Sequence, residues 1–118
     1  MYTKGKELVA QALSTIKGAT VAASYSIAMK QFPSILYAEV VNVPISKGVE
    51  ARTQLAYSID IYSDKSTTEL AHAVDEALTG LGLKRGQCMD VDDPSGLRHK
   101  NMKYTGVYDA NTKRIYQT

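Results

Sequence analysis

The chain of 118 residues contains one cysteine, no tryptophan and no long apolar run. The lone Cys88 forms no disulfide within the chain and supplies at most one ligand of a zinc site, which excludes disulfide scaffolds and zinc ribbons. A membrane helix needs roughly 20 apolar residues in succession, and no stretch approaches that length. Glu7, Gln11 and Ser14 interrupt any signal-like apolar region after the first lysines. We therefore expect no membrane partner and synthesis in a reducing, intracellular place.

The chain also has no large excess of charge of one sign. Its 14 lysines and arginines and 12 acidic residues give a net charge of +2. That balance is too small to indicate a nucleic-acid partner by itself. The distribution is less even: seven basic and four acidic residues follow from Lys84 onward, against seven and eight before it. Without repeats or low-complexity segments, residues 1–118 are expected to form one domain.

Two segments have the apolar spacing of helices that pack on a core. The first is Lys4–Lys17, with Gly18 as its C-terminal stop. The second starts at Ser66–Glu69, a capping box in which the serine hydroxyl accepts a hydrogen bond from the glutamate backbone N–H. Its apolar stripe then continues to Leu81, and Gly80 or Gly82 ends it.

Extended segments fill most of the remaining chain, and the best of them alternates polar and apolar residues over Arg52–Tyr62. The segment Ala19–Lys30 is weakly patterned and receives no element. Short turns separate the strands, which predicts an α+β fold of order α-β-β-α-β-β-β: one mostly antiparallel sheet with both helices on one face. The expected strands are Ser34–Val43, Arg52–Tyr62, Leu83–Val91, Arg98–Tyr108 and Arg114–Tyr116.

Two motifs suggest ligand sites and fail on spacing. Gly80-x-Gly82-x-x-x-Gly86 lacks the preceding strand and following helix of a phosphate-binding loop, so it is interpreted as the end of a helix. An EF-hand loop beginning at Asp90 needs an oxygen ligand and a glycine where Pro94 and Ser95 stand. The acidic residues there are interpreted as a solvated turn, and no metal or other cofactor is expected.

Catalytic signatures are equally scarce. Cys88 would form a nucleophile and base pair with His72 or His99 only if the fold brought the two side chains into contact. A lone cysteine in a strand is usually a small buried hydrophobic residue. No His-x-Glu, Gly-x-Ser-x-Gly or Cys-x-x-Cys pattern is present. The sequence predicts a protein that is not an enzyme.

The segment Arg98–Tyr104 is the strongest binding signal because it is rich in basic residues. Its cations suit phosphates and its aromatic residue suits base stacking, which describes a nucleic-acid module. The favoured alternative is a half-exposed strand with Met102 and Tyr104 inside. In a third alternative the cations meet the acidic turn Asp90–Asp93 of a neighbouring subunit.

A series of strand motifs extends over nearly the whole chain. It comprises Phe32–Tyr37 (FPSILY), Glu39–Pro44 (EVVNVP) and Leu55–Asp64 (LAYSIDIYSD), then Leu81–Leu83, Arg98–Tyr104, Gly106 and Arg114–Tyr116. In this order the motifs resemble the small tail-terminator proteins of long-tailed bacteriophages, also called tail-completion or minor capsid proteins. The stretch Ala19–Ala28 and the Asp-rich turn match no fixed pattern of that family.

The resemblance implies a structural virion protein that forms a hexameric ring at the head-proximal end of the tail tube. Such a ring stops tube polymerisation and presents the surface for head joining, with the tail tube protein and head-tail connector proteins as partners. The protein would be made in the host cytoplasm, and passive contact with DNA in the lumen stays open. A ring requires two unlike surfaces on each subunit. The residues expected at subunit or partner contacts are Lys47, Glu50, Arg52, Asp90, Asp92, Asp93, Arg98, Lys100 and Lys103.

Two other functions remain open at this point. A head-to-tail connector ring protein would share the size and oligomeric logic of a tail terminator, and only its binding partner would distinguish the two. A small nucleic-acid-binding module would use the basic segment 98–104, with an affinity that falls steeply with salt.

Overall fold

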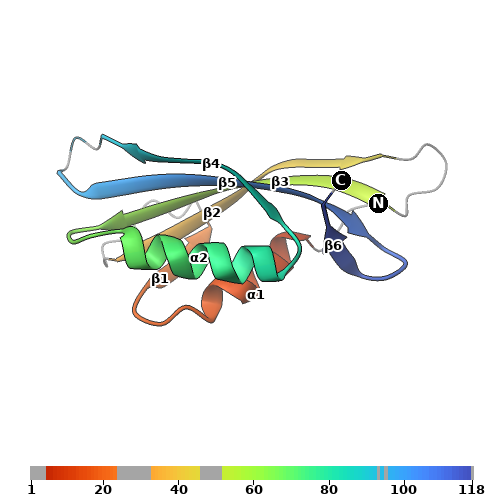
Figure 1. The fold of residues 1–118 in the computed structure, drawn as a ribbon, viewed down its shortest axis with the longest axis horizontal. Coiled ribbons are helices and arrows are strands. Elements are labelled where there is room, and N and C mark those ends of the chain that lie inside the picture. The colour runs from red at the N-terminus through yellow and green to blue at the C-terminus, as the bar shows by residue number, and fades with distance from the viewer. Residues whose placement is uncertain (1–4, 24–32, 46–51, 93, 95, 118) are drawn as a thin grey trace.

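The computed structural model describes residues 5–23, 33–45, 52–92, 94 and 96–117. The strands form one sheet of order β1-β2-β3-β5-β4, with β6 paired to β5 (Figure 1). Every pairing is antiparallel except that of β1 with β2. The predicted α+β class with a mostly antiparallel sheet is confirmed. The elements are α1 Gly5–Ser14, β1 Thr20–Ala23, β2 Ser34–Pro44, β3 Arg52–Ser63, α2 Thr68–Gly80, β4 Lys84–Val91, β5 Arg98–Asp109 and β6 Arg114–Tyr116.

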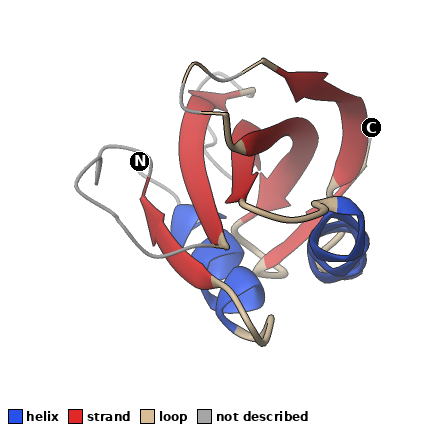
Figure 2. Cartoon of the chain, turned by 90° about the vertical axis from the view of Figure 1, so that its left-hand side faces the viewer, coloured by secondary structure: helices blue, strands red, loops and turns tan. Residues whose placement is uncertain are grey.

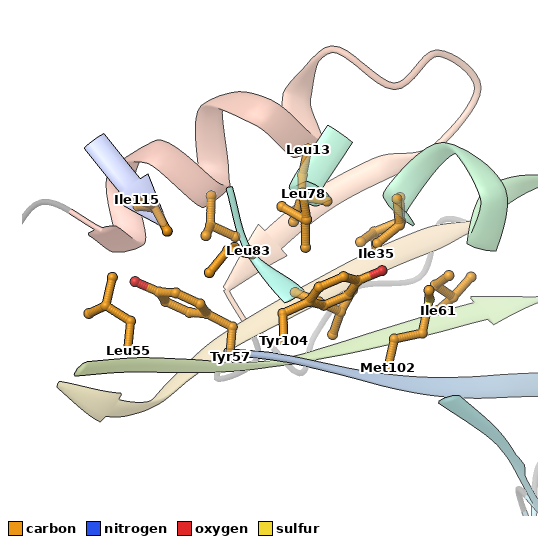
Figure 3. Close-up of a cluster of buried hydrophobic side chains, with 13 residues drawn as sticks. Leu13, Ile35, Leu55, Tyr57, Ile61, Leu78, Leu83, Met102, Tyr104 and Ile115 are labelled. Atoms are coloured by element: carbon orange, nitrogen blue, oxygen red, sulfur yellow. The ribbon is translucent and has the colours of Figure 1, made fainter. Parts of the chain in front are cut away.

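Both helices lie on the same side of the sheet, whose strands form an arc above them in Figure 2. The alternation in β3 explains this arrangement, because every second side chain from Leu55 to Ile61 is fully buried against the helices. Tyr104 of β5 lies beside Tyr57 in the register of the sheet, and both are buried in the core (Figure 3). The helices contribute the apolar residues Val9, Leu13, Val74 and Leu78 to the same core.

Strand β1 was not predicted from the sequence. It has four residues, all half-buried, and lies parallel to β2 with Thr20 opposite Ser34. Its entry is fixed by the Thr20 backbone N–H, which donates to the Pro33 carbonyl at 3.0 Å. A short edge strand without polar alternation gives no period-two signal, so backbone pairing with β2 decides its structure.

The ends of α2 differ in how well the sequence predicted them. The predicted capping box, with Ser66 bonded to the Glu69 backbone N–H, is wrong. The Ser66 hydroxyl accepts a hydrogen bond from the Thr68 backbone N–H at 3.3 Å, and Thr67 is the N-cap. The C-terminal end is the predicted glycine stop. Gly82, at φ +104°, donates to the Thr79 carbonyl and the next backbone N–H donates to the Leu78 carbonyl, which is a Schellman motif.

The molecule is elongated, measuring 48 × 24 × 22 Å. Its radius of gyration is 14.7 Å, above the value of about 13.5 Å for a globular chain of this length. Two hairpins cause this, because β2 and β3 extend past the helices at one end and β4 and β5 at the other (Figure 1). We call them the β2–β3 arm and the β4–β5 arm. Among the described residues, no helix is both long and apolar enough to cross a bilayer.

Candidate interaction surfaces

The acidic and basic residues expected at interfaces lie together on the β4–β5 arm. Asp90 and Lys100 are register partners, and the Lys100 Nζ lies 2.9 Å from the Asp90 Oδ1. Arg98 and Asp92 are exposed near the end of the same arm. The sequence suggested two separate surfaces of opposite charge, whereas the fold places both charges on adjacent strands and pairs two of them within one chain.

The remaining predicted residues are divided between the arms. Lys103 is exposed on the helix-free face of β5, opposite Ser58 of β3. Arg52 is exposed at the start of β3, on the β2–β3 arm. Lys47, Glu50 and Asp93 lie outside the described residues.

Exposed apolar side chains occur on both arms. On the β2–β3 arm, Val40 is 59% exposed at a β-bulge, and Val43 and Ile45 are more than half exposed further along. On the β4–β5 arm, Met89 is 45% exposed. Several large exposed apolar side chains on one hairpin, as on the β2–β3 arm, are typical of a surface that another protein covers, whereas one exposed methionine is ordinary.

A connected polar cluster occupies the helix-free face of the sheet, and the sequence analysis missed it. The His99 Nε2 lies 2.7 Å from the Asp60 Oδ1, and the His99 ring stacks on Tyr62 at 4.2 Å between centroids. The Asn101 amide donates to both Asp60 and the Ser58 hydroxyl, each at 2.9 Å. These residues alternate along β3 and β5, so only the strand register brings them together.

This polar cluster is suited to holding the two strands in register. The His99 imidazole contacts Asp60, whereas the Ser58 hydroxyl accepts from Asn101. A nucleophilic serine requires the imidazole as its own hydrogen-bond partner, and this arrangement does not provide it. The cluster therefore gives the helix-free face a rigid polar centre.

Cys88 is exposed, which contradicts the expectation of a buried hydrophobe. It is the register partner of Met102, whose side chain is in the core, whereas His99 lies on the other face of β5. Cys88 and His99 therefore do not form a nucleophile and base pair. In the described part of the chain, no three side chains of His, Cys, Asp or Glu gather as metal ligands do.

Tyr104 links the sheet to α2 through a buried hydrogen bond. Its side chain is fully buried, and its hydroxyl donates to the Asp75 Oδ1 at 2.8 Å. The Arg85 Nε lies 4.0 Å from the same carboxylate oxygen. Burial, and then the bond to the negative Asp75, raise the pKa of Tyr104 above its ordinary value of about 10.

The raised pKa of Tyr104 predicts a loss of stability in alkali. The folded state holds the phenolic proton more tightly than the unfolded state, so this contribution is complete below pH 10 and declines as the pH rises above it. We expect wild type to lose about 1 kcal/mol more than Tyr104→Phe between pH 9 and pH 11. Urea unfolding of both proteins at the two pH values measures the difference. Equal losses would contradict the assignment.

No family model matches this chain, and no curated protein matches it. Inferences about its function therefore depend on its own surfaces. Those surfaces are two protruding arms with apolar and charged side chains, and a polar sheet face without a helix on it.

Proposed function

We propose that the chain is a tail-terminator subunit of a long-tailed bacteriophage, a structural virion protein without catalytic activity. Six copies would form a ring at the head-proximal end of the tail tube, stop its polymerisation and offer the surface for head joining. The observation that carries the proposal is the pair of unlike arms, with Val43 and Ile45 exposed at one end of the domain and charged residues around Met89 at the other. The strand motifs behind the resemblance support it, since they coincide with β2, β3, β5 and β6.

The two arms provide the unlike surfaces that a ring requires. In a ring each subunit contacts its two neighbours through two different patches. The rotation that relates neighbouring subunits must return to the first subunit, because otherwise the contacts build an open filament. The β2–β3 arm is mainly apolar and carries Arg52, whereas the β4–β5 arm combines charges with Met89. The accessible surface of 7263 Å² exceeds the roughly 6,300 Å² typical of a monomer of this mass. The elongated shape accounts for this larger surface.

The ring would have the tail tube protein on one side and a connector protein on the other. A connector ring subunit would have the same geometry, so its binding partner separates the two functions. Exposed Arg98 and Lys103 on the β4–β5 arm also suit contact with DNA that passes through the lumen. Lys100 is less suited, because it is paired with Asp90.

Tube length tests the proposal. Tail tube protein that polymerises in the presence of the purified chain is expected to give short tubes with a cap at one end only, seen by negative-stain microscopy. The variant Arg98→Glu with Lys103→Glu leaves the Lys100 pair intact and is expected to cap fewer tubes. Tubes of unchanged length and bare ends, together with salt-sensitive DNA binding by the chain, would favour the nucleic-acid module instead.

A further inference from the structure

A groove of about 1050 Å³ lies between the C-terminal end of α1 and one face of α2, from Glu69 to Ala77. Its apolar residues include Ile16 after α1 and Leu70 and Ala77 on α2. Glu69 and Glu76 of α2 also line it, two helical turns apart and therefore on the same face of the helix. The lining of the groove is therefore mixed, with apolar side chains beside carboxylates on the α2 side.

The groove has a small excess of negative charge. Asp64, Glu69 and Glu76 are exposed, and none is within ion-pair distance of a cation in the described part of the chain. Lys17 and Lys65 also line the groove, which leaves a formal charge of −1. The C-terminal end of α1 adds the negative end of its helix dipole. A basic, protruding segment is the complementary occupant.

The turn between β5 and β6 has that character. Residues 111–114 are exposed and end in two cations, Lys113 and Arg114, which form no ion pair among the described residues. The Asp109 carboxylate accepts from the Asn111 backbone N–H at 2.9 Å and stiffens the turn. Lys113 has φ +57°, and it is the one non-glycine in the described segments with a positive φ. Asparagine or glycine adopts this conformation more easily than lysine does.

We propose that the β5–β6 turn of one copy docks in the α1–α2 groove of a second copy, with Lys113 and Arg114 against Glu69 and Glu76. The β5–β6 turn and the N-terminal end of α2, which borders the groove, lie toward opposite ends of the long axis of the molecule (Figure 1). Contact between them is therefore head to tail, the type of interface that closes into rings. The inference rests on the proposed ring and names a subunit contact within it.

Disulfide trapping tests the docking directly. In a Cys88→Ser background, chains with Glu76→Cys are mixed with chains that have Lys113→Cys and are then mildly oxidised. We expect a disulfide-linked dimer on a non-reducing gel, and a ladder of oligomers when both substitutions are in one chain. The matched control replaces Glu76→Cys with His72→Cys, because His72 is exposed on the same helix but does not line the groove. Dimers of equal yield in both pairs would overturn the docking.

A charge exchange provides the second test. Glu76→Lys or Lys113→Glu alone is expected to weaken association about tenfold by light scattering or on tube ends, and mixing the two variants is expected to restore it. If wild-type copies associate but neither single variant weakens the association, the docking is wrong while the ring stands. If wild-type copies associate neither in solution nor on tubes, both proposals are overturned.

Discussion

Replacement of Gly82 by alanine is expected to lower the free energy of unfolding by about 3 kcal/mol or more. Gly82 has φ +104°, a conformation that an alanine adopts only with strain. A Cβ at this position would also collide with the backbone carbonyl of Ile115. A backbone atom cannot move aside as the end of a flexible side chain can. The substitution would separate the end of α2 from β6, and urea unfolding measures the loss.

Gly80→Ala is the matched control, because Gly80 is two residues away, has no positive φ and has open space where a Cβ would be. Alanine is the better helix former, so Gly80→Ala is expected to change the free energy of unfolding by less than about 1 kcal/mol and in the stabilising direction. Similar losses for Gly80→Ala and Gly82→Ala would contradict the role of the close approach to β6.

Replacement of Tyr57 by alanine is expected to remove about 4 kcal/mol, a large part of the stability of a domain this size. Tyr57 is fully buried at the centre of β3, and a cavity would remain among side chains from both helices and the sheet (Figure 3). Its hydroxyl donates to the Glu39 Oε1 at 3.0 Å. α1 comes so close that a Cβ on Gly5 would meet the same hydroxyl. Thermal and urea unfolding measure the loss.

Tyr57→Phe separates the two contributions of this side chain. It keeps the ring in the core and removes the hydrogen bond to Glu39, so a loss of about 1 kcal/mol is expected. A loss as large as that of Tyr57→Ala would show that the bond to Glu39, rather than the packing of the ring, dominates.

The fold class was predictable because the strongest signals in the sequence are periodic. The alternation of 52–62 defined β3 nearly to its ends, and the apolar stripe after Ser66 defined α2. Local bonds were less predictable, since Ser66 bonds Thr68 rather than Glu69. Strand β1 was missed because four residues without alternation look like loop until β2 pairs with them.

The candidate surfaces were less predictable than the fold, because strand register decides them. From the order of charges along the chain, Asp90 and Lys100 were assigned to two different surfaces. The β4–β5 hairpin places them opposite each other. The polar cluster of Asp60, His99 and Asn101 required the pairing of β3 with β5, which the sequence does not specify. The exposure of Cys88 similarly follows from its position on the outermost strand β4.

We propose that copies of this chain assemble into a ring on the ends of tail tubes. The most direct measurement is the mass of the purified chain by light scattering, alone and mixed with tail tubes, followed by negative-stain imaging of the mixture. A ring or cap is expected on one end of each tube, and the amount of free chain is expected to fall as the chain binds to the tubes. A chain that stays monomeric and leaves both tube ends bare would contradict it.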